Sequence, residues 1–156
     1  MTSRSQDITI LPFQPEHQSE VKRLVLEGLA EHWGALDLAL NSDLNDISAA
    51  YAHSVFLVAW QNDRIIGTGA LIPRSHDTAE IVRMSVVIDM RRKGVGSKIL
   101  QRLCEQAKQN GYKHLILETT ETWHEAIEFY RQFGFQVTHR LDGNVYFSLE
   151  MTREED

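Results

Sequence analysis

Seven consecutive residues combine three cationic side chains with two glycines, a composition typical of phosphate-binding loops. The sequence reads Arg-Arg-Lys-Gly-Val-Gly-Ser from Arg91 to Ser97, between an apolar run and an amphipathic pattern. Gly94 and Gly96 let the chain turn without a Cβ clash. The first amides of the following helix are then unsatisfied and carry the positive end of its dipole. The loop is therefore suited to binding a diphosphate, and a basic turn without a ligand is the alternative.

Two other nucleotide-binding motifs fit this loop less well. A Rossmann fingerprint needs a third glycine where Ile99 stands, and its glycines follow the strand directly, whereas Asp89 to Lys93 intervene here. Glu118 stands roughly where that motif places its ribose-binding acid. A P-loop needs Gly-Lys-Ser/Thr at a fixed spacing, which the chain lacks. Neither motif is the preferred interpretation.

The hydrophobic pattern predicts one α/β domain over residues 1–156, with a mixed sheet in the order β-α-α-β-β-β-α-β-α-β-β. Strands are expected at 8–11, 55–60, 64–72, 79–88, 114–119, 135–141 and 145–151. Helices are expected from Val95 to a C-cap at 110–111, at about 123–133, and starting at Pro15 and Ser42. Turns at 62–63 and 142–143 predict two hairpins. The one β-α-β crossover places the glycine loop at the carboxyl end of the fourth strand, where such sheets bind ligands.

Composition and charge narrow the class of protein. The chain has 156 residues and a net charge of −6, which argues against a general nucleic-acid binder. No apolar run approaches the roughly 18 residues of a membrane span, and residues 1–7 do not resemble a signal peptide, so we expect a cytoplasmic protein. Cys104 is the single cysteine, which excludes an internal disulfide. Five scattered histidines lack metal-ligand spacing, so no metal is expected: His17, His53, His76, His114 and His139.

A longer stretch carries a resemblance to a known family. From Ile81 the chain reads IVRMSVVIDMRRKGVG, then an expected helix, then LETT, then AIEFYRQFGF up to Phe135. This stretch resembles the GCN5-related N-acetyltransferase (GNAT) superfamily. Arg91-x-x-Gly94-x-Gly96 matches the acetyl-CoA signature of that family, Arg/Gln-x-x-Gly-x-Gly/Ala. The order of elements is compatible with the whole GNAT fold, so the resemblance covers nearly the full chain.

The resemblance implies acetyl-CoA as the acyl donor. In the family, the fourth strand separates from the fifth and pairs through its backbone with the pantetheine arm, a role that falls here on Met84, Ser85 and Val86. The diphosphate is held by amides that follow the signature arginine. That role falls on the loop and the first helical turn: Arg92, Lys93, Gly94, Val95, Gly96 and Ser97.

The resemblance also implies catalytic residues. Tyr130 matches the family's tyrosine near the thioester sulfur, although the sequence alone would place it in the core. Reference pKa values near 10 and 8.5 make proton transfer to a thiolate uphill by roughly 2 kcal/mol, so a hydrogen bond is the other way for Tyr130 to act. Glu118 resembles the base of some members, and Glu80 on the fourth strand is its rival. A histidine, or no dedicated base, stays open.

One position departs from the family pattern. Many members carry an asparagine five residues after the position of Glu118, in contact with the cofactor, and Trp123 stands there in this chain beside His124. Trp123 would line the acceptor pocket, cover the pantetheine arm, or serve as packing at a helix start.

The acceptor side in this family is built from the first two helices and the closing hairpin. Carboxylates beside aromatic rings in the first two helices suit a cationic amine, and an ordinary solvated helix face is the alternative. The residues concerned are Glu31, His32, Trp33, Asp37, Asp43, Asp46 and Tyr51.

The sequence therefore predicts an acetyl-CoA-dependent N-acetyltransferase that acts on a primary amine by direct attack in a ternary complex. A small molecule or amino acid derivative is favoured as acceptor, and a protein N-terminus stays open. The alternative function is a CoA-binding sensor or interaction module without catalysis. We expect neither nucleic acid nor membrane as a partner, and since family members often dimerise, a homodimer remains open.

Overall fold

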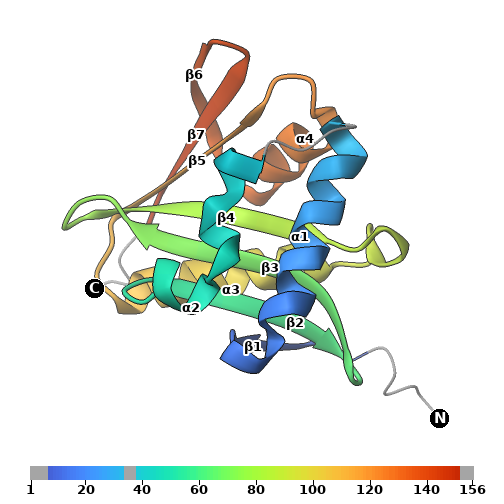
Figure 1. Cartoon of the computed structure of the whole chain (residues 1–156). Helices are drawn as coiled ribbons and strands as arrows, with labels where there is room; N and C mark the ends of the chain where they lie inside the picture. Colours follow the sequence, from blue (N-terminus) through green and yellow to red (C-terminus); the bar gives the residue numbers. More distant parts are fainter. Residues whose placement is uncertain (1–6, 34–37, 152–156) are drawn as a thin grey trace.

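The chain folds around one seven-stranded mixed sheet with helices on both faces (Figure 1). The computed structural model describes residues 7–33 and 38–151. Figure 1 shows α1 and α2 in front of the sheet and α3 and α4 behind it. The strands are β1 (Thr9–Pro12), β2 (Val55–Gln61), β3 (Arg64–Pro73), β4 (Thr78–Val86), β5 (His114–Thr120), β6 (Gln136–Leu141) and β7 (Asn144–Glu150). The helices are α1 (Gln18–Trp33), α2 (Ile47–Ala50), α3 (Val95–Gln109) and α4 (His124–Phe133), with 3-10 turns η2 (Pro15–His17), η3 (Leu38–Asn45) and η4 (Ile88–Met90).

The predicted fold class is confirmed, and the sheet has the order β1-β2-β3-β4-β5-β7-β6. The second predicted helix is wrong in its form. Instead of one helix from Ser42, the chain forms η3 with a kink at Asn41, and then a four-residue α2. Asp46 separates the two because its side chain accepts a hydrogen bond from the amide of Ala49 (3.1 Å) and caps α2. Leu44 and Ile47 are fully buried.

All the strands and the last helix have at least one boundary that differs from the prediction by one or two residues. Two of these differences concern the end of the fourth strand and the start of the last helix. The fourth strand ends at Val86 rather than at Ile88, because residues 88–90 form η4. The last helix begins at His124, and Trp123 is its N-cap residue. Both differences lie at element ends, where a sequence pattern is least informative.

Two hydrophobic clusters hold the helices to the sheet. The larger one joins α3 and α4 to one face, with Ile99, Leu103 and Phe147 almost fully buried. The smaller one joins α1, η3 and α2 to β2 and β3 on the other face, around Val21 and Leu44. The strands β2 and β3 therefore present alternate side chains to different helices.

Two glycines on β3 let α3 approach the sheet closely. A Cβ at Gly67 would lie 2.9 Å from Cδ1 of Ile99, and a Cβ at Gly69 would lie 2.6 Å from Cγ2 of Ile99 and 2.8 Å from Sδ of Met84. Since interiors are packed at nearly crystalline density, these positions have no room for a methyl group. The glycines thus fix how deeply α3 sits against the centre of the sheet.

The strands β4 and β5 separate after a short parallel contact. They pair only at Thr78 with His114, Ala79 with Leu115, and Glu80 with Ile116. Beyond that point β5 pairs along its length with β7, and β4 continues beside β3 to Val86. The far half of β4 therefore has an edge that does not pair with β5, as the fourth strand of the family is expected to have.

An irregularity in β4 lies within this separated half. The register between β3 and β4 shifts between Thr68 and Ala70, opposite Arg83, which has φ of 57°. The hydroxyl of Thr68 donates a hydrogen bond to the carbonyl oxygen of Arg83 (2.8 Å) and is fully buried. This bulge turns the Arg83 side chain toward η3, as its contacts below show.

The close packing of α3 against β3 predicts that a methyl group added at Gly69 lowers the stability of the fold. Gly69→Ala should lower the free energy of unfolding by about 1 to 3 kcal/mol, because the added methyl displaces Ile99 and Met84. Chemical denaturation measures the change. Gly28→Ala in α1 is the control: its Cβ meets only the flexible Oγ of Ser85, and alanine favours the helix, so stability should change by less than about 1 kcal/mol. Equal losses in both variants would contradict the packing argument.

Candidate active site

The glycine loop ends in a helix N-terminus that has no side-chain cap. Gly94 is the N-cap of α3 with φ of 87°, and Arg92 has φ of 63°. No side chain caps the first turn of α3, and that turn contains no acidic residue. The amides of Val95, Gly96 and Ser97 thus form the uncapped, positively polarised N-terminus of a 15-residue helix. This geometry suits a bound diphosphate.

The signature arginine braces the loop through its side chain. Nε of Arg91 donates to the carbonyl oxygen of Val86 (2.9 Å), and Nη1 and Nη2 donate to the two carboxylate oxygens of Glu31 on α1 (2.9 and 2.8 Å). A planar guanidinium forms such two-pronged contacts with a fixed orientation. Arg91 therefore ties the end of β4 to α1. Glu31, which the sequence analysis assigned to the acceptor side, is the partner of Arg91, and no local pattern links these two residues.

The other cations of the loop are exposed. Arg92 pairs with Glu125 of α4 (2.5 Å), with both side chains largely in solvent, and Lys93 is exposed. At Gly96 an added Cβ would lie 3.4 Å from the ring of Phe129. This is an ordinary van der Waals distance, so the start of α3 lies against α4 and position 96 has room for a methyl group.

The predicted pantetheine strand lies beside this loop. Sδ of Met84 points toward Gly69 and α3, whereas Oγ of Ser85 lies under Gly28 of α1. Val86 ends the strand, and its side chain approaches Gly96. The two faces of this stretch thus contact different helices, and its backbone edge faces the opening between β4 and β5.

Tyr130 lies in an aromatic cluster beneath the site. Its side chain is 8% exposed, and its ring centroid lies 5.1 Å from that of Phe129, 6.0 Å from Phe135 and 5.9 Å from Phe147. Burial raises the pKa of the Tyr130 hydroxyl well above its usual value of 10. The phenol is therefore a weaker acid here than in water.

The two candidate bases differ in their surroundings. Glu80 is 14% exposed in its side chain, and its Oε1 accepts a hydrogen bond from Nε of Arg74 (2.6 Å). Glu118 is exposed on β5, opposite Tyr146 of β7, and within the described ranges no hydrogen bond or ion pair engages its carboxylate. Both lie on the face that carries α1, because their neighbours Ala79, Ile81 and Leu117 are buried on the other face.

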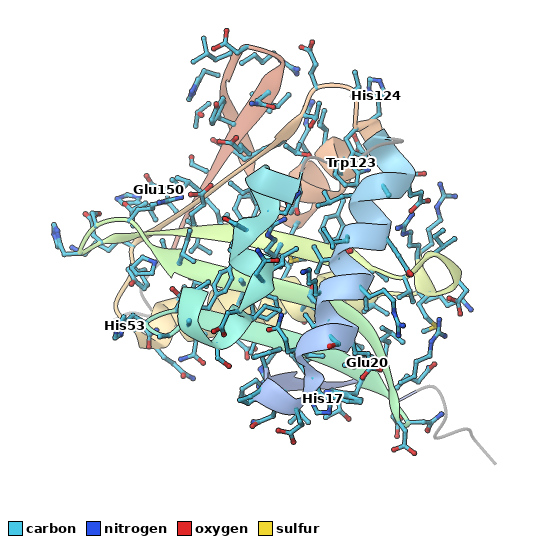
Figure 2. The ribbon with its side chains drawn as sticks, viewed as in Figure 1. His17, Glu20, His53, Trp123, His124 and Glu150 are labelled. Carbon is cyan, nitrogen blue, oxygen red and sulfur yellow. The ribbon has the colours of Figure 1, made fainter. Side chains whose placement is uncertain are left out.

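Trp123 and His124 stand at the start of α4, where Figure 2 labels them. The amide of Trp123 donates to the carbonyl oxygen of Thr120 (3.0 Å), and its own carbonyl accepts from the amide of Ile127 (3.1 Å). Trp123 is half-buried and His124 is exposed. Trp123 thus shapes the turn between β5 and α4 whatever its further role.

A cluster of polar side chains on the front face joins the predicted acceptor-side residues Asp43 and Tyr51 to two residues that the sequence did not single out. Nε and Nη2 of Arg83 donate to both oxygens of Asp43 (3.0 and 2.6 Å), Nη1 donates to Asn41 (2.9 Å), and the hydroxyl of Tyr51 donates to Asp43 (2.6 Å). The ion-paired side chains are only 16% and 28% exposed. We call these four residues the Arg83 cluster. It fastens η3 and α2 to the bulge of β4.

The Arg83 cluster shifts the pKa values of its members. Burial alone would raise the pKa of Asp43, but the hydrogen bonds from Arg83 and Tyr51 outweigh it and lower the pKa below 3.8. Burial, together with the hydrogen bond to Asp43, raises the pKa of Tyr51 to about 12. Asp43 is therefore an ionised partner of Arg83, which leaves it poorly suited to bind a cationic acceptor. Asp37 lies outside the described residues, as do the side chains of His32 and Trp33.

One surface hollow lies away from the glycine loop. It has a volume of about 390 Å³, opens between α2 and β2, and is lined by Phe13, Tyr51 and Phe56 among others. Of the residues named in the sequence-based prediction of the site, only Tyr51 lines this hollow. The described residues contain no cluster of His, Cys, Asp or Glu arranged to hold a metal ion. In the same part of the chain, no helix is both long and apolar enough to cross a membrane.

Comparison with known proteins identifies the family. The family described as the acetyltransferase (GNAT) family matches residues 19–135. Since this match covers most of the chain, the protein belongs to the GNAT family of acetyltransferases. The superfamily predicted from the signature loop is thus confirmed.

Curated relatives share part of their length with this chain. The uncharacterized N-acetyltransferase YsnE of Bacillus subtilis is 37% identical over 83 residues, 52% of this chain and 55% of that protein. The N-acetylaspartate synthetase of Danio rerio is 36% identical over 105 residues, 65% of this chain and 37% of that protein. The chain thus spans about half or less of the length of these relatives.

Solved structures share the fold over nearly their whole length. A GNAT acetyltransferase of Staphylococcus aureus superposes with a TM-score of 0.84 at 21% identity, covering 94% of this chain and all of that chain. The PaiA N-acetyltransferase of Thermoplasma acidophilum, solved with coenzyme A, gives 0.81 at 17% identity, covering 92% and 99% of the two chains. At such identities the likeness establishes the fold alone.

The Arg83 cluster predicts a pH-dependent contribution to stability. Asp43→Asn should lower the free energy of unfolding at neutral pH by about 1 to 2 kcal/mol, because a partly buried guanidinium loses its charged partner. The pKa of Asp43 is lower in the folded state, so its contribution is complete above the ordinary carboxyl value of 3.8 and is lost as the pH falls through the folded value. Urea unfolding of both proteins between pH 7 and 2 should show the difference shrinking with acid.

Asp89→Asn provides the control for this cluster. It breaks a two-pronged pair with Arg64 in which both side chains are more than half exposed. Water and salt screen such a pair, so stability at neutral pH should change far less than in Asp43→Asn. A larger loss in the Asp89 variant would be inconsistent with the proposed importance of the Arg83 cluster.

Proposed function

We propose that this protein is an acetyl-CoA-dependent N-acetyltransferase that transfers the acetyl group to a primary amine in a ternary complex. The observation that carries the proposal is the meeting of two unsatisfied backbone surfaces. The uncapped N-terminus of α3 lies next to the edge of β4 that has left β5. The first suits a diphosphate and the second a pantetheine amide, and both groups occur in acetyl-CoA. Family membership supports the assignment.

The donor would lie along β4. Amides of residues 92–97 would hold the diphosphate, and the backbone of residues 84–86 would pair with the pantetheine arm. Arg91 would act indirectly, since its guanidinium is engaged by Val86 and Glu31 and braces the loop. Solved relatives in the family carry coenzyme A or acetyl-CoA, which supports this donor.

The acceptor would enter from the face that carries α1. A neutral amine attacks the thioester carbonyl carbon, and a backbone N–H near Val86 would stabilise the resulting oxyanion. A base must remove the ammonium proton before attack. Glu118 is the preferred base because its carboxylate is exposed and unengaged, whereas that of Glu80 is paired with Arg74. Trp123 would line the acceptor side or the pantetheine arm.

Tyr130 would assist departure of the CoA thiolate. Because burial raises its pKa, complete proton transfer to the sulfur is less favourable than in water. A hydrogen bond from the hydroxyl to the thiolate is the role that fits this environment. The tyrosine would thus stabilise the leaving group without becoming ionised.

A small molecule or amino acid derivative is the favoured acceptor, and a protein N-terminus is the other class. We propose a single domain over residues 1–156 that acts in the cytoplasm, either as a monomer or as a homodimer. The alternative function is a CoA-binding module without catalysis. One observation favours that alternative: Tyr130 is packed among three phenylalanines, as a purely structural residue would be.

Thermal unfolding tests the donor. Acetyl-CoA and CoA at a hundred times their Kd should each stabilise the protein by about 2.7 kcal/mol, which raises the midpoint by roughly 5 to 10 °C for a chain of this size. NADH should give no shift, because the loop lacks the third glycine of a dinucleotide site. Absence of a shift with both CoA compounds would remove the proposed function.

Tyr130→Phe and Glu118→Gln test the catalytic roles. Each should lower kcat by at least about tenfold while the affinity for acetyl-CoA stays within a few-fold, because neither change alters the diphosphate loop. Thiol release with an amine acceptor measures kcat, and calorimetry measures binding. Glu80→Gln is the matched control and should retain most activity. Equal losses of turnover and of binding in Tyr130→Phe would assign Tyr130 to packing.

A further inference from the structure

Three polar side chains form a row across the half of the sheet made by β5, β7 and β6. Glu118 pairs in register with Tyr146, and Tyr146 pairs with His139. Residues directly opposite each other in antiparallel strands share a face. The preceding row, which includes Leu117 and Phe147, is buried against α3 and α4 on the back face. Glu118, Tyr146 and His139 therefore lie together on the front face, and we call them the acceptor row.

No helix of the described chain packs over the acceptor row. In Figure 1, α1 and the segment η3–α2 cross β2, β3 and β4, and the β6–β7 hairpin projects beyond them. The side chains agree with this view: Glu118 and His139 are exposed, and Tyr146 is half-buried. The row begins at β5, the strand that borders the opening beside β4. A ligand that reaches the opening would therefore also reach the row.

The two rings of the row form a flat, ordered surface. The ring centroids of His139 and Tyr146 are 4.4 Å apart, and the ring planes differ by 4°. A register shift between Val137 and His139 inserts Thr138 as an extra residue of β6. Thr138 stands beside the stack and bonds to both of its members.

Thr138 contacts the ring of His139 as well as the backbone of Tyr146. Oγ1 of Thr138 lies 3.2 Å from the carbonyl oxygen of Tyr146, to which it can donate, and 2.9 Å from Nδ1 of His139. A hydroxyl has one proton, so both contacts are hydrogen bonds only if Nδ1 donates to Oγ1. In that neutral tautomer of the imidazole, Nε2 presents a lone pair. Within the described ranges, no donor engages Nε2.

The row thus offers groups that attract a cation with N–H donors. It contains a carboxylate, two aromatic faces and the lone pair of Nε2. The neighbouring cation on β6, Arg140, is opposite the buried Val145 and so belongs to the other face. A distal carboxylate would meet no positive charge in this row.

We propose that the acceptor row binds the second nitrogen of a linear diamine whose first nitrogen is acetylated. This inference rests on the proposed function. The reacting nitrogen would lie near Glu118 at the opening, and the distal ammonium would lie over Tyr146 and His139, donating a hydrogen bond to Nε2. Adjacent strands are about 4.8 Å apart, so the two nitrogens would be separated by about 5 to 10 Å.

The first test compares acceptors that differ only in their distal group. Diamines with four, six and eight carbons are assayed with acetyl-CoA beside the monoamines and the ω-amino acids of equal length. At least one diamine should exceed its matched monoamine at least tenfold in kcat/KM, and the ω-amino acids should be the poorest acceptors. Monoamines that match or exceed every diamine would overturn the proposal.

The second test uses variants of the row. His139→Ala should lower the ratio of kcat/KM for diamine over monoamine at least fivefold. Thr138→Val, which removes the hydroxyl beside Nδ1 of His139, should also lower this ratio. Thr138→Ser keeps a hydroxyl at this position and should retain the ratio of the native protein. His53→Ala is the control, since His53 is exposed at the turn after α2 (Figure 2) and should leave the ratio unchanged. A ratio that does not change in His139→Ala would overturn the role of this ring.

A binding readout separates this inference from the proposed function. In the protein saturated with CoA, ¹⁵N spectra of the histidine rings should show His139 protonated at Nδ1, and the Nε2 signal should shift on addition of the preferred diamine but not of its monoamine. If this shift occurs while no amine is acetylated, diamine binding by the acceptor row is supported and the proposed enzymatic activity is contradicted. If amines are acetylated without any shift at His139, diamine binding by the acceptor row is contradicted and the proposed enzymatic activity is supported.

Discussion

The separation of β4 from β5 is the constraint on which the site depends. The two strands share three parallel pairs, between Thr78–Glu80 and His114–Ile116, and β7 pairs with the opposite edge of β5. Beyond Glu80 the facing edges of β4 and β5 are not paired with each other. The bulge at Arg83 lies in this part of β4 and strengthens its twist. The opening thus lies within the sheet itself, between the unpaired edges of two neighbouring strands.

Close packing brings the helix terminus to this opening. Gly67 and Gly69 allow α3 to sit deep against β3, which carries its N-terminus toward the end of β4. Arg91 then joins three elements: its own loop, the last carbonyl of β4 and the carboxylate of Glu31 on α1. A single guanidinium therefore couples the loop that is open to an anion with the helix on the opposite face of the sheet.

The acidic residues of the front face differ in whether a partner engages their carboxylates. Glu31 is held by Arg91, Asp43 by Arg83, and Asp46 by the start of α2. These carboxylates stabilise the arrangement of α1, η3 and α2. Glu118 differs because it stands on β5 beyond the reach of these helices, on the uncovered half of the sheet. The front face thus divides into a part where charge maintains structure and a part where polar groups face solvent.

Local signals in the sequence determined the order of elements, the glycine turn into α3, the hairpins at 62–63 and 142–143, and the family. Periodicity and turn chemistry depend on residues close together in the sequence, so these features can be predicted before the tertiary structure is known. The sequence did not reveal that Arg91 pairs with Glu31 sixty residues away, that Arg83 takes up Asp43, or that Glu118, Tyr146 and His139 form one row. These contacts depend on strand register, on a bulge and on the depth of α3. Such features arise only when distant segments pack together, and for that reason the tertiary structure alone decided them.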